Sequence, residues 1–185
     1  MSYARSIAEL KRRAVQMGLC GEYTDAWNKA KNSNDLVRIA ADINGADFIC
    51  AGVAKGWGTS PDFIADNFPD DINRMLKTWS NKYLSALFVK FSGNINVDVT
   101  ILTIISSNAT VQINEHAVTR IFVSGNCSLN IRNGGNVMVY CYDNSVVNIE
   151  NTNSMAKCQC VSKEMIGSYI KDTWLFMENN KNMKE

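Results

Sequence analysis

The spacing of apolar residues changes along the chain, from a helical period in the first part to strict alternation in the second. In the first part, apolar residues recur every three or four positions, which places them on one face of a helix. The first such set consists of Ile7, Leu10, Ala14 and Met17. The pattern predicts five helices: one that stops at Gly18, one at 23–30, one from Ser33 or Asn34 to Gly45, one at 47–55, and one from Ser60-Pro61 to about Phe68. Residues 70–86 fit either a short helix or a strand.

From Leu87 onward, apolar and polar residues alternate with a period of two, which is typical of β-strands. The runs that are rich in β-branched and aromatic residues lie at 87–91, 101–105, 119–123 and 137–141. Each run leads into a corner that contains asparagine and then into a second short strand. We therefore expect each repeating unit to hold at least two strands.

A short motif that begins with asparagine recurs at Asn108, Asn126 and Asn144, which are 18 residues apart, with a looser copy at Asn94. A fixed period of this size indicates stacked coils, and the asparagines are expected to hydrogen-bond along equivalent corners. Positions six apart are also apolar or glycine. This sub-period gives a partial resemblance to the triangular β-helix of hexapeptide-repeat proteins, although the glycine typical of that repeat is missing. A flattened two-sided solenoid fits as well, and the period does not fix the handedness.

The predicted fold is therefore α+β, with a helical head at 1–82, a short parallel β-solenoid at 83–161, and a capping helix with a tail at 162–185. The solenoid is expected to have about four coils of roughly 18 residues each. The open ends of a solenoid need covers. We expect the head to cover one end and an apolar-faced helix at 163–177 to cover the other.

Composition excludes several classes of function. The net charge is +1, so the chain as a whole is not drawn to nucleic acid or anionic membranes. The sequence lacks a signal-peptide run and a membrane-spanning segment, which predicts a cytoplasmic protein. The six cysteines are spaced for neither a disulfide framework nor a metal site. We expect no metal and no cofactor.

His116 is the only histidine and lies in a loop between two coils. Hexapeptide-repeat acyltransferases use one histidine as a general base, so His116 is the candidate catalytic residue if the chain is such an enzyme. No acceptor-binding signature accompanies it. The leading expectation is that the chain is not an enzyme.

Charged and aromatic residues supply the candidate partner-binding positions. Residues 53–64 resemble a helix-turn-helix, but its second helix displays Asp62 and Asp66, and carboxylates facing phosphates argue against direct DNA binding. An acidic protein-binding face remains, together with the basic cluster at 11–13. The full candidate set is Lys11, Arg12, Arg13, Asp62, Asp66, Phe122, Tyr140 and Tyr142. Phe122 and Tyr140 are 18 residues apart and are expected to stack, either as exposed contacts or as packing between head and solenoid or between subunits.

Residues 19–27 (Leu-Cys-Gly-Glu-Tyr-Thr-Asp-Ala-Trp) and 54–64 (Ala-Lys-Gly-Trp-Gly-Thr-Ser-Pro-Asp-Phe-Ile) resemble conserved hypothetical proteins of phages, prophages and mobile elements of gut bacteria. In these proteins a helical head precedes a β-repeat tail. The resemblance implies an accessory protein that binds a host protein or nucleoprotein complex, for example as an inhibitor of a defence complex such as a CRISPR nuclease. The alternatives are the acyltransferase and a self-assembling virion accessory protein, which would be a homo-oligomer.

Overall fold

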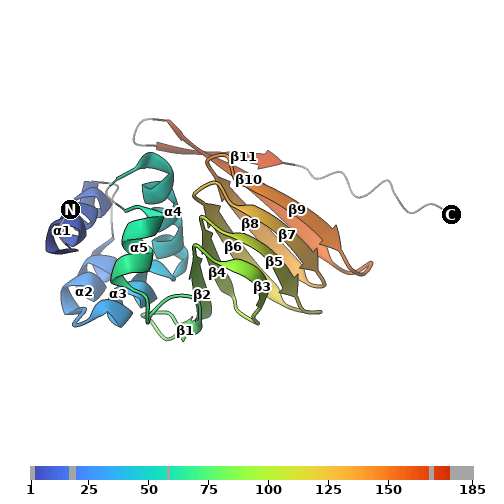
Figure 1. Cartoon of the computed structure of the whole chain (residues 1–185), viewed down its shortest axis with the longest axis horizontal. Helices are drawn as coiled ribbons and strands as arrows, with labels where there is room; N and C mark the ends of the chain where they lie inside the picture. The colour runs from blue at the N-terminus through green and yellow to red at the C-terminus, as the bar shows by residue number, and fades with distance from the viewer. Residues whose placement is uncertain (1–2, 17–19, 58, 167–168, 176–185) are drawn as a thin grey trace.

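A computed structural model describes residues 3–16, 20–57, 59–166 and 169–175. Helices gather at one side of the molecule and a stack of strands forms the other (Figure 1). The helices are α1 (Tyr3–Gln16), α2 (Gly21–Lys29), α3 (Ser33–Ala40), α4 (Ile43–Lys55) and α5 (Pro61–Asn67). The presence of the five predicted helices is therefore confirmed, together with the cap of the last one. The predicted stop of the first helix at Gly18 lies outside the described residues.

Side-chain caps set where α3, α4 and α5 begin. The Ser60 hydroxyl accepts a hydrogen bond from the Phe63 N–H at 3.0 Å, and Pro61 occupies the first turn of α5, as the sequence predicts. The predicted third helix was expected to reach Gly45, but α3 ends at Ala40. The Asp42 side chain accepts from the N–H of Ile43, so a second cap starts α4 earlier than expected.

The strands form two sheets, and we call them the large sheet and the small sheet. The large sheet has the order β1-β2-β4-β6-β8-β10-β11, and the small sheet has the order β3-β5-β7-β9. Their bounds are β1 (Met75–Lys77), β2 (Leu84–Val89), β3 (Ser92–Asn96), β4 (Ile101–Ile105), β5 (Asn108–Ile113), β6 (Val118–Ser124), β7 (Ser128–Asn133), β8 (Asn136–Tyr142), β9 (Val146–Asn151), β10 (Lys157–Ile166) and β11 (Tyr169–Leu175). The strands from β2 to β10 pair in parallel, while β1 and β11 pair antiparallel at the edges. The predicted parallel solenoid of about four coils is confirmed, in its two-sided form.

Coil length varies around the predicted 18 residues. Strand pairing joins Ser85 to Ile101, 16 residues later, and Asn136 to Lys157, 21 residues later. Asn126 and Asn144 remain in register, but Asn108 pairs with Ser128 because the intervening coil is longer. The expected asparagine ladder is therefore displaced from these corners. Amide hydrogen bonds between coils join Asn148 to Asn130 at 3.2 Å and Asn133 to Asn151 at 2.9 Å.

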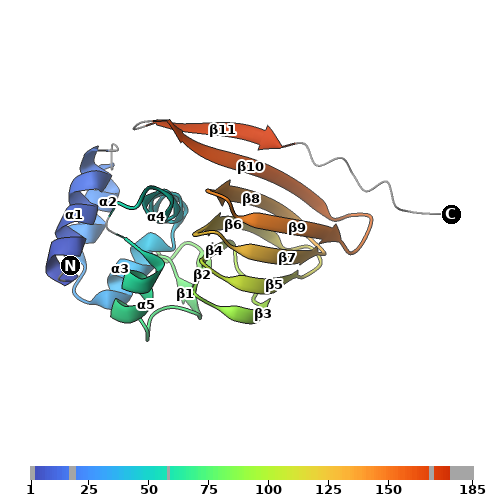
Figure 2. The same cartoon turned by 45° about the horizontal axis from the view of Figure 1, so that its top comes forward.

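The head packs on the outer face of the large sheet (Figure 2). The prediction that it covers an open end of the solenoid is therefore wrong. Two apolar layers result. One fills the space between the two sheets, and the other lies between the large sheet and helices α3, α4 and α5. The sequence of β4 gives the reason, because Ile101 and Leu102 point to opposite faces and both are fully buried. A sheet that is apolar on both faces needs a layer on each.

The predicted capping helix at 163–177 is wrong over the described residues. Lys157–Ile166 and Tyr169–Leu175 form the antiparallel pair β10–β11, which extends the large sheet. A short apolar run fits both a helix and a strand, and this one is rich in the aromatic and β-branched residues that strands favour. The tail at 176–185 lies outside the described residues.

Candidate functional site

The aromatic residues proposed as exposed contacts lie between the solenoid and the head. Phe122 is 2% exposed and Tyr142 is fully buried. The rings of Phe122 and Tyr140 stack with centroids 4.7 Å apart and an interplanar angle of 16°. The predicted stacking is confirmed, but the exposure predicted for Phe122 and Tyr142 is wrong because the head covers this face of the sheet. The Tyr142 hydroxyl donates a hydrogen bond to Asp47 of α4.

The charged candidates lie on two separate helices of the head. On α1, Lys11 donates a hydrogen bond to Asn28 of α2 and Arg12 is exposed, while the side chain of Arg13 lies outside the described residues. Asp62 and Asp66 are exposed on α5. Asp62 forms an ion pair with Lys90, at the corner between β2 and β3. One of the acidic candidates thus joins the head to the solenoid.

His116 lies in the turn between β5 and β6, is exposed, and adopts a left-handed backbone conformation with φ of +65°. His116 lines a hollow together with Glu115, Gly134, Gly135, Asn136, Asn153 and Met155. Among the described residues, no hydrogen bond or ion pair orients the imidazole. The role of His116 as a general base stays a prediction.

The six cysteine thiols are free, and those of the solenoid face its interior. Burial is the main cause that raises the pKa of Cys141 to about 12, so this thiol is protonated at neutral pH. A protonated thiol is a poor nucleophile and a poor metal ligand. Within the described ranges, no three His, Cys, Asp or Glu side chains gather in a group that could hold a metal ion.

The outer face of the small sheet carries three rows of side chains that cross all four strands, and all of these side chains except Val146 are polar. The strand registers align Ser92, Asn108, Ser128 and Val146 in one row, Asn94, Thr110, Asn130 and Asn148 in the next, and Asn96, Gln112, Arg132 and Glu150 in the third. Arg132 and Glu150 form an ion pair with a separation of 3.6 Å. No described helix covers this face, in contrast to the outer face of the large sheet.

The small sheet ends at β9, although the large sheet continues with β10 and β11 (Figure 2). The apolar residues that face the solenoid interior are consequently less buried at this end. Leu129 and Ile131 of β7 are 0% and 1% exposed, whereas their partners Val147 and Ile149 in β9 are partly exposed. The interior of the last coil is thus incompletely covered by the described residues.

Two hydrogen bonds show which backbone groups of β9 face β7. The N–H of Val146 donates to the carbonyl of Cys127 and the N–H of Thr152 donates to that of Asn133, both at 2.8 Å. Successive residues in a strand direct their backbone groups to opposite sides. The N–H and C=O groups of Val147 therefore face away from β7, as do those of Ile149. No strand within the described part of the chain pairs with this outer edge.

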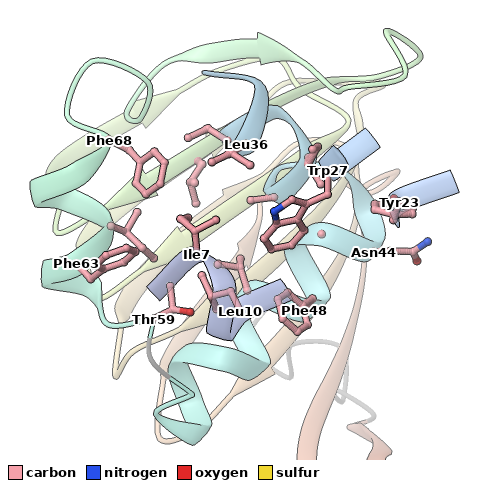
Figure 3. Close-up of a pocket in the computed structure, with 17 residues that line it drawn as sticks. Ile7, Leu10, Tyr23, Trp27, Leu36, Asn44, Phe48, Thr59, Phe63 and Phe68 are labelled. Carbon is pink, nitrogen blue, oxygen red and sulfur yellow. The ribbon is translucent and has the colours of Figure 1, made fainter. Parts of the chain in front are cut away.

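A separate cavity of about 80 Å³ lies inside the head (Figure 3). Residues from all five helices and from β2 line it, and most of them are apolar. The lining includes two buried hydroxyl-bearing residues, Tyr23 and Thr59, which are 7% and 3% exposed. Among the side chains of the described residues, the Thr59 hydroxyl is one of three buried polar groups that lack a hydrogen-bond partner. The sequence gives no signal for this cavity, because it arises from helices that are distant along the chain.

Alkaline pH is expected to destabilise the head through Tyr23. Burial, assisted by the nearby carboxylate of Asp42, raises the pKa of Tyr23 from 10.0 to about 12. Between these values the folded chain binds more protons than the unfolded chain, so the free energy of unfolding falls as pH rises. We expect the ionisation of Tyr23 to lower the free energy of unfolding by about 1.4 kcal/mol between pH 9 and pH 11.

Urea unfolding of the Tyr23→Phe variant at both pH values measures this effect. Between these two pH values, the free energy of unfolding should fall by about 1.4 kcal/mol less in the variant than in the natural chain. The remaining tyrosines are common to both chains and do not contribute to this difference. An identical pH dependence in the two chains would show that the Tyr23 phenol ionises as easily when folded as when unfolded.

Comparisons of the chain with protein-family models, curated proteins and solved structures gave no match. In the part of the chain that the structure describes, no helix is long and apolar enough to cross a membrane. The function of this chain must therefore be inferred from its own sequence and geometry.

Proposed function

We propose that the protein is a non-enzymatic binding module that accepts an extended strand of a protein partner at the outer edge of β9. The observation that carries this proposal is the mismatch between the sheets. Among the described residues, no strand pairs with the backbone of Val147 and Ile149 at the end of the small sheet. An unpaired strand edge is a template for another strand, and adding one is a common mode of peptide recognition.

The side chains at this edge define the chemistry of the partner. Val147 and Ile149 point into the solenoid and are partly exposed, so an added strand gains by placing apolar residues beside them. Outward, β9 presents Val146, Asn148 and Glu150, and the one charge among them is paired with Arg132. We therefore propose a partner segment with alternating apolar and polar residues and few charges.

The residues proposed from sequence give a different picture of the contact surface. Phe122 and Tyr142 are buried under the head, and Asp62 is paired with Lys90, so these positions contribute less than the β9 edge in our proposal. The basic cluster on α1 and the exposed Asp66 stay predictions. The resemblance to phage and mobile-element proteins makes a bacterial host protein or nucleoprotein, such as a defence complex, the partner that we propose to search for.

The Val147→Pro variant should lose partner binding by at least about tenfold. Proline removes an N–H that faces the outer edge, and it leaves the β7–β9 ladder intact because that ladder uses residues 146, 148, 150 and 152. The loss of one or two backbone hydrogen bonds is worth about 1.4 kcal/mol, which corresponds to tenfold in affinity. Retention of host proteins on immobilised natural and variant chains, with and without nuclease, measures the change.

A matched control comes from the same strand. The Asn148→Ala variant removes an outward side chain and keeps every backbone group of β9, so it should retain the partner. A photo-crosslinking residue at Val146 should label the partner, whereas the same residue at the similarly exposed Val118 of β6 should not. Equal retention by the Val147→Pro variant, or equal labelling from both positions, would contradict the proposal. A crosslink to a second copy of the chain would favour self-assembly.

A further inference from the structure

The cavity inside the head has the features of a built binding site rather than those of a random packing defect. Its walls are mostly apolar side chains contributed by separate helices, and among the described residues the Thr59 hydroxyl is the one buried side-chain polar group of the lining that lacks a hydrogen-bond partner. A buried hydroxyl without a partner costs free energy, and most buried polar groups in proteins are hydrogen-bonded. The position of Thr59 on this cavity therefore indicates a missing hydrogen-bond partner (Figure 3).

The position of the hydroxyl relative to α4 is also defined. A Cβ atom built on Gly52 would lie 3.6 Å from the Thr59 oxygen, so this oxygen lies close to the α4 backbone. The backbone carbonyl of Gly52 is already used by the N–H of Trp57 at 2.9 Å. The second hydroxyl-bearing residue of the lining, Tyr23, is oriented by contacts with Asp42 and Trp79. Of the two buried hydroxyl groups of the lining, that of Thr59 is thus the one available to a ligand.

We propose that this cavity binds a small aliphatic molecule that carries one hydrogen-bonding oxygen, with the Thr59 hydroxyl as its polar partner. The volume sets the size of the ligand. An engineered apolar cavity of about 150 Å³ holds benzene, so a cavity of about half that volume fits roughly three to four non-hydrogen atoms. A short-chain alcohol such as propan-1-ol matches both the size and the single oxygen.

The site is separate from the β9 edge and does not depend on the protein-binding function. Its ligand enters the head, whereas the proposed partner strand adds to the small sheet. Because a ligand of roughly three to four non-hydrogen atoms gains only a limited binding free energy, we expect a dissociation constant in the millimolar range. The two proposals can therefore be tested and can fail independently.

Chemical-shift titration of the full chain with propan-1-ol, and separately with xenon, tests the inference. In the natural chain, both probes should give saturable shifts at Val37, Thr59 and Ile64, which line the cavity. The Thr59→Val variant keeps the shape and removes the hydroxyl. It should bind propan-1-ol at least about fivefold more weakly, bind xenon unchanged, and unfold at a higher temperature without ligand.

A second variant fills the space. Val37→Phe adds four carbon atoms, as many non-hydrogen atoms as propan-1-ol contains, and should abolish saturable binding of both probes. Alcohol shifts that grow linearly without saturation in the natural chain would overturn the proposal, as would equal alcohol affinity in the Thr59→Val variant. If the Val37→Phe variant fails to fold, the xenon and Thr59→Val measurements still decide the outcome.

Discussion

Replacing Phe122 with alanine is expected to reduce the free energy of unfolding by about 3–5 kcal/mol, the range for a large aromatic side chain removed from a packed core. Phe122 is 2% exposed and belongs to the apolar layer between the large sheet and the head. Its ring also stacks on Tyr140 in the next coil. Truncation therefore removes buried apolar area and leaves a cavity between two packed layers.

Urea unfolding followed by circular dichroism measures the change, and the same strand supplies the control. Val118 and Phe122 both belong to β6, but Val118 is 65% exposed. Val118→Ala should therefore change the free energy of unfolding by less than about 0.5 kcal/mol. If Phe122 were an exposed contact, as its sequence position first suggests, Phe122→Ala would behave like the control and would weaken partner binding instead. The two variants thus separate a packing role from a binding role.

The sequence predicts the strands and the approximate period because both depend on local patterns. Runs of β-branched residues such as Ile101–Ile105 form strands, and the asparagine motif reports the mean length of a coil. The same motif cannot report the shape of a coil, because a period counts residues along the chain and says nothing about where the chain turns. A two-sided solenoid and a triangular one both return after about 18 residues.

The place of the head was predictable in principle from β4, where Ile101 and Leu102 lie on opposite faces and are both apolar. This signal indicates a second covering layer, but it does not say which segment provides it. Phe122 and Tyr140 show the same limit, since their spacing predicts their stacking and not the helix above them. The capping helix expected at 163–177 is wrong over the described residues because a short apolar run does not distinguish a helix from a strand.

The candidate sites were beyond sequence reasoning for a different reason. The edge of β9 becomes visible only when the strands of both sheets are counted, since β9 itself resembles the strands before it. The Thr59 hydroxyl is a candidate because it lacks a hydrogen-bond partner, and this lack depends on all the residues that surround it in the fold. Both features are properties of the assembled fold.

Replacing Gly45 with alanine is expected to destabilise the chain by about 3 kcal/mol or more, although helix propensity alone predicts a gain of about 0.5–1 kcal/mol. α3 and α4 are joined by a tight turn, and a Cβ atom at Gly45 would lie 1.9 Å from the carbonyl oxygen of Ile39. The obstructing atom belongs to the backbone, so it cannot move aside as a flexible side chain would. Relief of the clash requires the two helices to separate.

Gly52 provides the matched control, because it is buried in the same helix and a Cβ atom there would meet only the Thr59 oxygen, at an ordinary 3.6 Å. We expect Gly52→Ala to stabilise the chain by up to about 1 kcal/mol through the lower backbone entropy of the unfolded state. Urea unfolding of the two variants therefore gives shifts of opposite sign. If Gly45→Ala were also stabilising, α3 and α4 would have to cross at a greater distance than in this structure, and the cavity that they help to enclose would have a different shape.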